Sequence, residues 1–310
     1  MAIPAEFQER EYESLFIQEL ARFGSFTWSP GQTDEFFLGF DGASWVSPLQ
    51  LMRFGFPTPG AIQNRRPRLW PFWLPDFWYG KRLHPEFVNE WRRFADDAFP
   101  RKSLNFFVQH KRPHQTTVQG VCGDHWGQAY YEFKIDRQQQ TRLEELENRL
   151  SNAAVVTYSC AAFLKKADLW KHQENATLIA NSNFVSVKAL KGHSRYTFIE
   201  PGHTGFANVD PEEIRDKPIL ERIAEAYEQS EGLFSYQVRT AARAVHAIMD
   251  EEAPDGTSLY HQLLSRVADG LDVERSEDDF FYSLLQVLAF NTVNSTSWAI
   301  ITKPDDKEQK

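Results

Sequence analysis

The residues best suited to chemistry in this chain are one aspartate and a Gln-x-Lys triplet, each at the end of an apolar stretch. Asp41 follows the run 36–40, and Gln109 and Lys111 close the run 104–111. Because side chains alternate along a strand, Gln109 and Lys111 would project from the same face. A lysine is rarely buried without a partner, and Asp41 on a neighbouring strand would supply one. Aspartate, an amide oxygen and lysine are groups that can hold a divalent cation and hydrolyse a phosphodiester.

Three glutamates could add a further ligand. Residues 6–23 form an amphipathic helix whose apolar face has Glu19 near its centre and Glu13 at its edge. A carboxylate that points inward is costly unless it is paired or binds a metal. The alternative for Glu19 is a place at the rim of the core, paired with an arginine. If residues 35–41 are extended, Glu35 shares a face with Asp41.

The elements around these residues predict an α/β fold. We expect strands at 35–41, 104–110, 130–135 and 154–160. A helix at 138–150 has Leu143, Leu146 and Leu150 as its inner stripe. With the helix at 6–23 in front, this order is typical of a mixed sheet flanked by helices. A helix at 167–179 follows, and then come short strands at 184–190 and 194–200 that could form a hairpin.

From residue 211 the pattern becomes helical, with helices expected at 211–230, 233–251, 257–269 and 276–300. Asp210 is suited to cap the first of these helices, and Pro211 is suited to its first position. We therefore expect one domain at 1–210 and an acidic helical domain or subdomain at 211–310. The second region could be a lid or a dimerisation surface.

The net charge of −9 is unevenly distributed. Residues 53–112 contain 12 lysines and arginines and 5 acidic residues, whereas residues 211–310 contain 10 and 20. The basic region could face phosphates, or its charges could be scattered and only balance the acidic helices. The prolines of 69–80 exclude a regular helix or a central strand there. Those aromatic side chains could stack on bases, dock a partner protein or pin a loop to the fold. The candidate nucleic-acid-binding residues are Arg65, Arg66, Arg68, Lys81, Arg82 and Arg112.

The remaining composition points to a cytoplasmic protein. Cys122 and Cys160 lack the spacing of a metal knuckle or a disulfide framework. No stretch approaches the roughly 18 apolar residues of a membrane span, and the first residues lack the features of a signal peptide.

A helix with a glutamate, a strand ending Gly-Phe-Asp-Gly and a strand ending Gln-x-Lys-Arg resemble the PD-(D/E)XK nuclease superfamily. The pattern is similar to its Mrr-like restriction-endonuclease group, in which a glutamine replaces the second acid. The resemblance covers about residues 6–165. It implies a restriction-endonuclease-like mixed β-sheet in which Asp41 and Gln109 bind metal and Lys111 orients the attacking water. The helical glutamate of the family maps to Glu19 or Glu13, and Glu35 is an additional candidate ligand. Residues 43–103 become a large insertion between the two halves of the site.

The resemblance implies a Mg²⁺- or Mn²⁺-dependent endonuclease that cuts DNA in a restriction or anti-phage defence system. It could act as a homodimer or with a partner subunit. One alternative is a non-catalytic subunit that binds nucleic acid or protein through a nuclease-like fold. Another is a regulatory protein that senses nucleotides.

Overall fold

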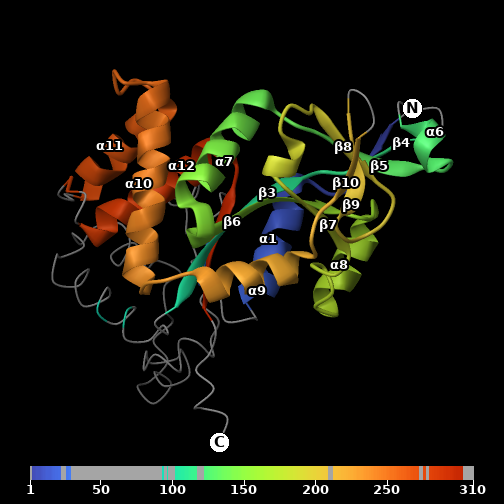
Figure 1. Ribbon diagram of the computed structural model, residues 1–310, viewed down its shortest axis with the longest axis horizontal. Helices are drawn as coiled ribbons and strands as arrows, with labels where there is room; N and C mark the ends of the chain where they lie inside the picture. Colours follow the sequence, from blue (N-terminus) through green and yellow to red (C-terminus); the bar gives the residue numbers. More distant parts are fainter. Residues whose placement is uncertain are drawn as a thin grey trace, which may run out of the picture.

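The computed structural model describes residues 2–21, 26–28, 93, 96, 102–116, 122–208, 212–271, 275–276 and 279–302. Figure 1 shows a mixed α/β chain with a helical C-terminal region, which confirms the predicted fold class. The predicted strand at 35–41 and most of the insertion at 43–103 lie outside the described residues. So do the following candidate site residues: Glu35, Asp41, Arg65, Arg66, Arg68, Lys81 and Arg82.

The central sheet has the strand order β2, β11, β3, β6, β7. Strands β3 (Ser103–Lys111) and β6 (Ala154–Ala161) pair in parallel, with Lys111 opposite Cys160. Strand β11 (Ser297–Thr302) is antiparallel to β3 and to β2 (Phe26–Trp28), and β7 (Ser182–Ser186) is antiparallel to β6. Nearly every residue of β3 and β6 is buried, as expected of parallel strands covered on both faces.

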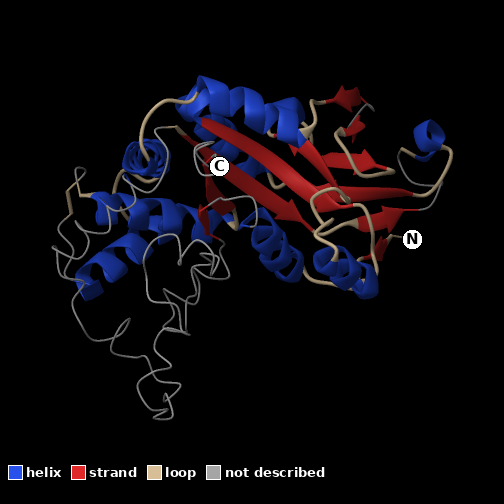
Figure 2. Cartoon of the chain, turned by 90° about the horizontal axis from the view of Figure 1, so that it is seen from below, coloured by secondary structure: helices blue, strands red, loops and turns tan. Residues whose placement is uncertain are grey.

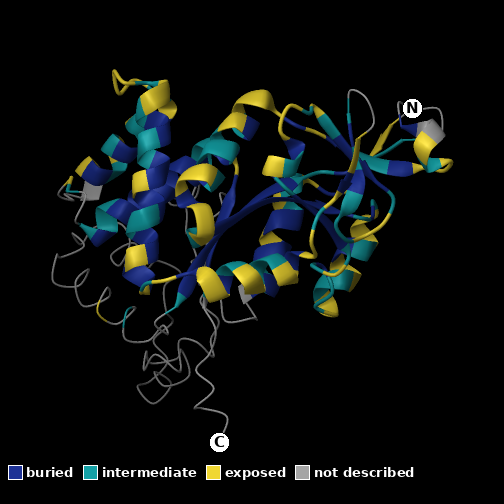
Figure 3. Cartoon of the chain, viewed as in Figure 1, coloured by how far each residue is buried: buried dark blue, intermediate teal, exposed yellow. Residues whose placement is uncertain are grey.

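Helices cover both faces of this sheet (Figure 2). On the Phe107 face lie α7 (Arg137–Leu150), α10 (Phe234–Glu252) and α12 (Phe280–Asn294). The predicted leucine stripe of α7 is buried there. On the Phe106 face lie α1 (Glu9–Ala21), α8 (Lys166–Glu174) and α9 (Ile219–Gln229). Figure 3 shows the burial of the strands between these helices, whose outer faces are exposed.

A second, antiparallel sheet has the order β1, β4, β5, β8, β9, β10. Its strands are β1 (Ile3–Pro4), β4 (His114–Thr116), β5 (Tyr130–Lys134), β8 (Arg195–Phe198), β9 (Thr204–Ala207) and β10 (Glu212–Arg215). The short helix α6 (Gly123–Trp126) lies between β4 and β5 in the sequence. The sequence pattern predicted that residues 104–110 and 130–135 share one mixed sheet. Instead, β3 lies in the central sheet and β5 lies in this second sheet. Phe133 and Tyr196 of the second sheet belong to the same apolar cluster as Phe107, so the two sheets share a core.

The predicted hairpin of 184–190 and 194–200 does not form. Strand β7 pairs with β6 and β8 pairs with β5, in different sheets. The 3₁₀ turn η2 (Lys188–Leu190) separates them in the sequence, and another turn of this kind, η1 (Ser151–Ala153), precedes β6. The predicted helix at 167–179 is α8, which ends at Glu174.

The C-terminal helices also differ from the prediction at both ends. Residues 212–215 form β10, and the first helix begins at Ile219 rather than at Pro211. Helices α10 and α11 (Leu259–Leu271) agree with the sequence pattern. The last helix ends at Asn294 because Ser295 adopts a left-handed conformation with φ +50°, and the chain continues as β11.

A buried hydrogen-bond network joins this C-terminal region to β3. The Asn105 amide donates to Oε1 of Gln237 at 2.8 Å, and Trp298 Nε1 donates to Oδ1 of Asn105 at 2.9 Å. All three side chains are fully buried, so these polar atoms need partners inside the protein. The network holds β11 against β3. One apolar cluster contains residues from both sides of residue 210, so that boundary does not separate two cores.

Candidate functional site

Lys111 ends β3, at the point where the chain leaves the central sheet for β4. Its Nζ donates to Oε1 of Gln139 on α7 at 2.7 Å and lies 5.6 Å from the centroid of the Tyr158 ring. Gln139 is itself held, because its Nε2 donates to the backbone carbonyl of Asn294. Burial lowers the pKa of Lys111, while the negative charge of Glu9 acts in the opposite direction. Contacts from α7 and β6 thus hold the ammonium group in one place.

Glu9 lines the same cleft as Lys111, and its negative charge, like that of Asp136, favours the charged form of Lys111. Glu9 lies in the first turn of α1, and burial raises its pKa. The positive charge of Lys111 and a backbone hydrogen bond from Arg112 oppose that rise. The prediction from sequence missed Glu9 because it considered acids on the apolar face of the helix. The sequence feature that could have identified Glu9 is its place in the first turn of the helix, because a residue there can approach the end of a strand.

A cleft of about 500 Å³ opens beside these two groups. It is lined by Ala2, Glu9, Lys111, Arg112, His114, Glu132, Phe133, Lys134 and Arg195. Four of these side chains are lysine or arginine and two are acidic. Arg195 pairs with Glu132 at 3.5 Å. The Arg112 guanidinium donates to the backbone carbonyl of Ala5, so this predicted phosphate-binding residue also anchors the N-terminal segment. The cleft is small and has a surplus of positive charge.

Gln109 lies beneath Lys111 on the same face of β3 and is only 1% exposed. Its Nε2 donates to the backbone carbonyl of His110 at 3.0 Å. Within the described part of the chain, its Oε1 has no hydrogen-bond partner. An unpaired buried acceptor is costly, so this oxygen is a candidate ligand for a cation. Gln109 does not itself line the cleft.

The structure does not bring Glu19 or Glu13 to this cleft. The Glu19 carboxylate accepts from the backbone N–H groups of Leu178 at 2.7 Å and Ile179 at 3.1 Å. Helix α1 packs on the face of β3 opposite to Gln109 and Lys111. Glu13 accepts from Oγ of Ser297 at 2.6 Å. Both acids are buried, as the apolar periodicity of the helix predicts, but backbone and hydroxyl groups donate hydrogen bonds to them, and neither lines the cleft.

His110 is buried between the rings of Tyr12 and Phe16, with centroid distances of 5.4 and 4.8 Å. Among the described residues neither of its ring nitrogens has a hydrogen-bond partner. Burial alone lowers its pKa from 6.5 to about 3. His110 is therefore neutral in the folded protein at ordinary pH, and it faces away from Lys111.

We expect His110 to make the fold sensitive to acid. Its folded-state pKa lies below its unfolded value, so below pH 6.5 only the unfolded chain takes up this proton. The free energy of unfolding should then fall by about 1.4 kcal/mol per pH unit from this residue alone, or about 2 kcal/mol at pH 5. Urea unfolding at pH 7 and pH 5 should show this loss in the wild type and a smaller loss in His110→Phe. An equal loss in both proteins would contradict the assignment.

Comparison with models of protein families, with curated proteins and with solved structures finds no match. None of the described helices is long and apolar enough to cross a membrane.

Proposed function

We propose that this chain is a Mg²⁺-dependent nuclease that hydrolyses phosphodiester bonds at the cleft beside Lys111. The observation that carries the proposal is a cleft that contains both the largely buried ammonium group of Lys111 and the Glu9 carboxylate and that has surplus positive charge. The choice of DNA, and a role in restriction or anti-phage defence, rest on the resemblance to PD-(D/E)XK nucleases.

The residues present suit a hard divalent cation, which prefers oxygen ligands. Glu9 offers a carboxylate at the cleft, and Gln109 offers a buried oxygen without a partner among the described residues. Asp41, which lies outside those residues, would be the third ligand. Once bound, the cation would acidify a water molecule and offset charge on the phosphate.

The other residues would bind and orient the substrate. The Lys111 ammonium would stabilise negative charge that develops on the phosphate, because Gln139 already fixes its position. Lys134 and Arg195 lie on the β5 and β8 side of the cleft and would contact flanking phosphates. Arg112 would do so less, because its guanidinium is bound to Ala5.

Cleavage of plasmid DNA, single-stranded DNA and RNA should be measured with Mg²⁺, with Mn²⁺ and with a chelator. We expect cleavage with the metals only. In Glu9→Gln, the Mg²⁺ concentration for half-maximal cleavage should rise by at least about 10-fold, because even the loss of an outer-shell partner of a metal site costs about 10-fold to 100-fold in affinity. Glu132→Gln is the matched control, because its carboxylate lines the same cleft but pairs with Arg195.

Cleavage that persists in the chelator would contradict the proposal, and so would an unchanged Mg²⁺ requirement in Glu9→Gln. If the protein binds nucleic acid in a salt-dependent manner without cutting it, the non-catalytic binding subunit becomes the better description.

A further inference from the structure

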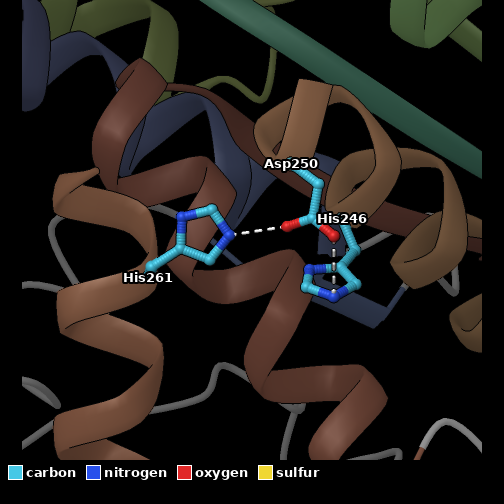
Figure 4. Close-up of side chains that lie close together, drawn as sticks. All are labelled: His246, Asp250 and His261. Carbon is cyan, nitrogen blue, oxygen red and sulfur yellow. Dashed lines mark hydrogen bonds and ion pairs between the residues drawn. The ribbon is translucent and has the colours of Figure 1, made fainter. Parts of the chain in front are cut away.

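A group of two histidines and one aspartate lies between α10 and α11, apart from the cleft (Figure 4). His246 and Asp250 are four residues apart on α10, and His261 lies on α11. The Asp250 carboxylate lies between the two rings, with Oδ1 2.6 Å from Nε2 of His261 and Oδ2 3.4 Å from Nε2 of His246. One ligand atom from each residue lies within 4.8 Å of the other two.

We propose that His246, Asp250 and His261 bind a divalent transition metal ion of the zinc type. Two imidazole nitrogens and one carboxylate oxygen form a set that suits zinc, whereas Mg²⁺ and Ca²⁺ prefer oxygen ligands throughout. Three protein ligands leave one tetrahedral position free. The Asp250 side chain is 49% exposed, against 15% for His261, so the aspartate side of the group is open to solvent.

The distances are close to those that a zinc site requires. With metal–ligand bonds of about 2.0–2.1 Å, tetrahedral ligand atoms lie roughly 3.3 Å apart. The pair of His246 and Asp250 is already at 3.4 Å. Because no pair exceeds 4.8 Å, small side-chain rotations would close the site without a movement of the helices.

Hydroxyl groups hold the other nitrogen of each imidazole. Oγ of Ser258 lies 2.7 Å from Nδ1 of His261, and the Tyr260 hydroxyl lies 3.3 Å from Nδ1 of His246. Such partners orient histidine ligands in metal sites. A hydroxyl can donate or accept, so it pairs with Nδ1 whether Nε2 carries a proton for Asp250 or is free to bind a metal. The same surroundings therefore serve the metal-free and the metal-bound state.

The neighbouring acids are already engaged elsewhere. Asp250 is followed by Glu251 and Glu252, which pair with Arg149 and Arg142 of α7. These pairs hold the end of α10 against α7, and Asp250 is left to face the histidines. A metal here would link α10 to α11 across the turn at 253–258, so its binding should stabilise the fold.

The test uses the full chain without an affinity tag, stripped of metal. Titration with Zn²⁺ should show one site per chain, and Co²⁺ should give the visible absorption of a tetrahedral complex. The thermal midpoint should rise with Zn²⁺ and not with Mg²⁺. Asp250→Asn and His261→Gln should each weaken Zn²⁺ binding at least about 10-fold. Circular dichroism would confirm that the variants fold.

His193→Gln is the matched control, because among the described residues His193 pairs with one carboxylate, that of Glu212 at 3.4 Å. It should bind Zn²⁺ as the wild type does. Lys111→Met should also retain the site, which separates this proposal from the cleft. Zn²⁺ affinity that is unchanged in both Asp250→Asn and His261→Gln would overturn the proposal, as would a wild type that binds no Zn²⁺.

Discussion

Replacement of Lys111 by methionine should lower Mg²⁺-dependent cleavage by about 100-fold or more, the range seen when one positioned group that stabilises developing charge is removed. Methionine retains the apolar stem beside Tyr158 and removes a charge whose burial is unfavourable. The fold should therefore survive, at the cost of one hydrogen bond to Gln139. Initial rates at saturating Mg²⁺ provide the measurement.

Lys134→Met is the control, because Lys134 lies in the same cleft but is exposed. It should weaken substrate binding more than it lowers the maximal rate. Because burial lowers the pKa of Lys111, cleavage by the wild type should also decline as the pH rises through that lowered value, where the ammonium group loses its proton. Wild-type rates in Lys111→Met would exclude a catalytic role for this residue.

Replacement of Glu19 by glutamine should destabilise the protein by about 2 kcal/mol or more and leave the cleft chemistry intact. The carboxylate is 3% exposed and accepts from the N–H groups of Leu178 and Ile179. An amide has a single acceptor oxygen and would turn its NH₂ group toward one of these donors, which leaves a buried N–H unpaired. Urea unfolding and Mg²⁺-dependent cleavage should be measured on the same preparation.

Glu11→Gln is the matched control on the same helix. Glu11 pairs with Lys166 at the surface, where such pairs contribute about 0–1 kcal/mol. If Glu19→Gln kept wild-type stability but lost cleavage, this result would support a catalytic role for Glu19. The expected result instead gives Glu19 a role in stability and leaves Glu9 as the acid that acts in the cleft.

Local periodicity was sufficient to place the elements nearest the cleft. The alternation over 104–111 predicted β3, and the spacing of Leu143, Leu146 and Leu150 predicted the buried face of α7. Both patterns arise within a few residues, because they depend on which face of one element is buried. The same patterns showed that acids on α1 point inward.

Pairings between distant segments could not be predicted in this way. Residues 297–302 continue the apolar pattern of α12. They form a strand because they can pair with β2 on one side and with β3 on the other. Strands β7 and β8 are close in sequence, but each finds a partner in a different sheet. Which pairing forms depends on the edges and cores available in the folded chain, and a local pattern contains no information on these.

The sequence by itself determined the α/β class and a strand with Gln109 and Lys111 on one face, because helix and strand periods are local properties. The tertiary structure decided which acids meet which groups. It placed Glu9 and Lys111 in one cleft, whereas the Glu19 carboxylate accepts hydrogen bonds from the backbone of Leu178 and Ile179. It also brought His261 of α11 to His246 and Asp250 of α10. A side chain's partner depends on how whole elements pack, and packing is settled only when the complete core is buried.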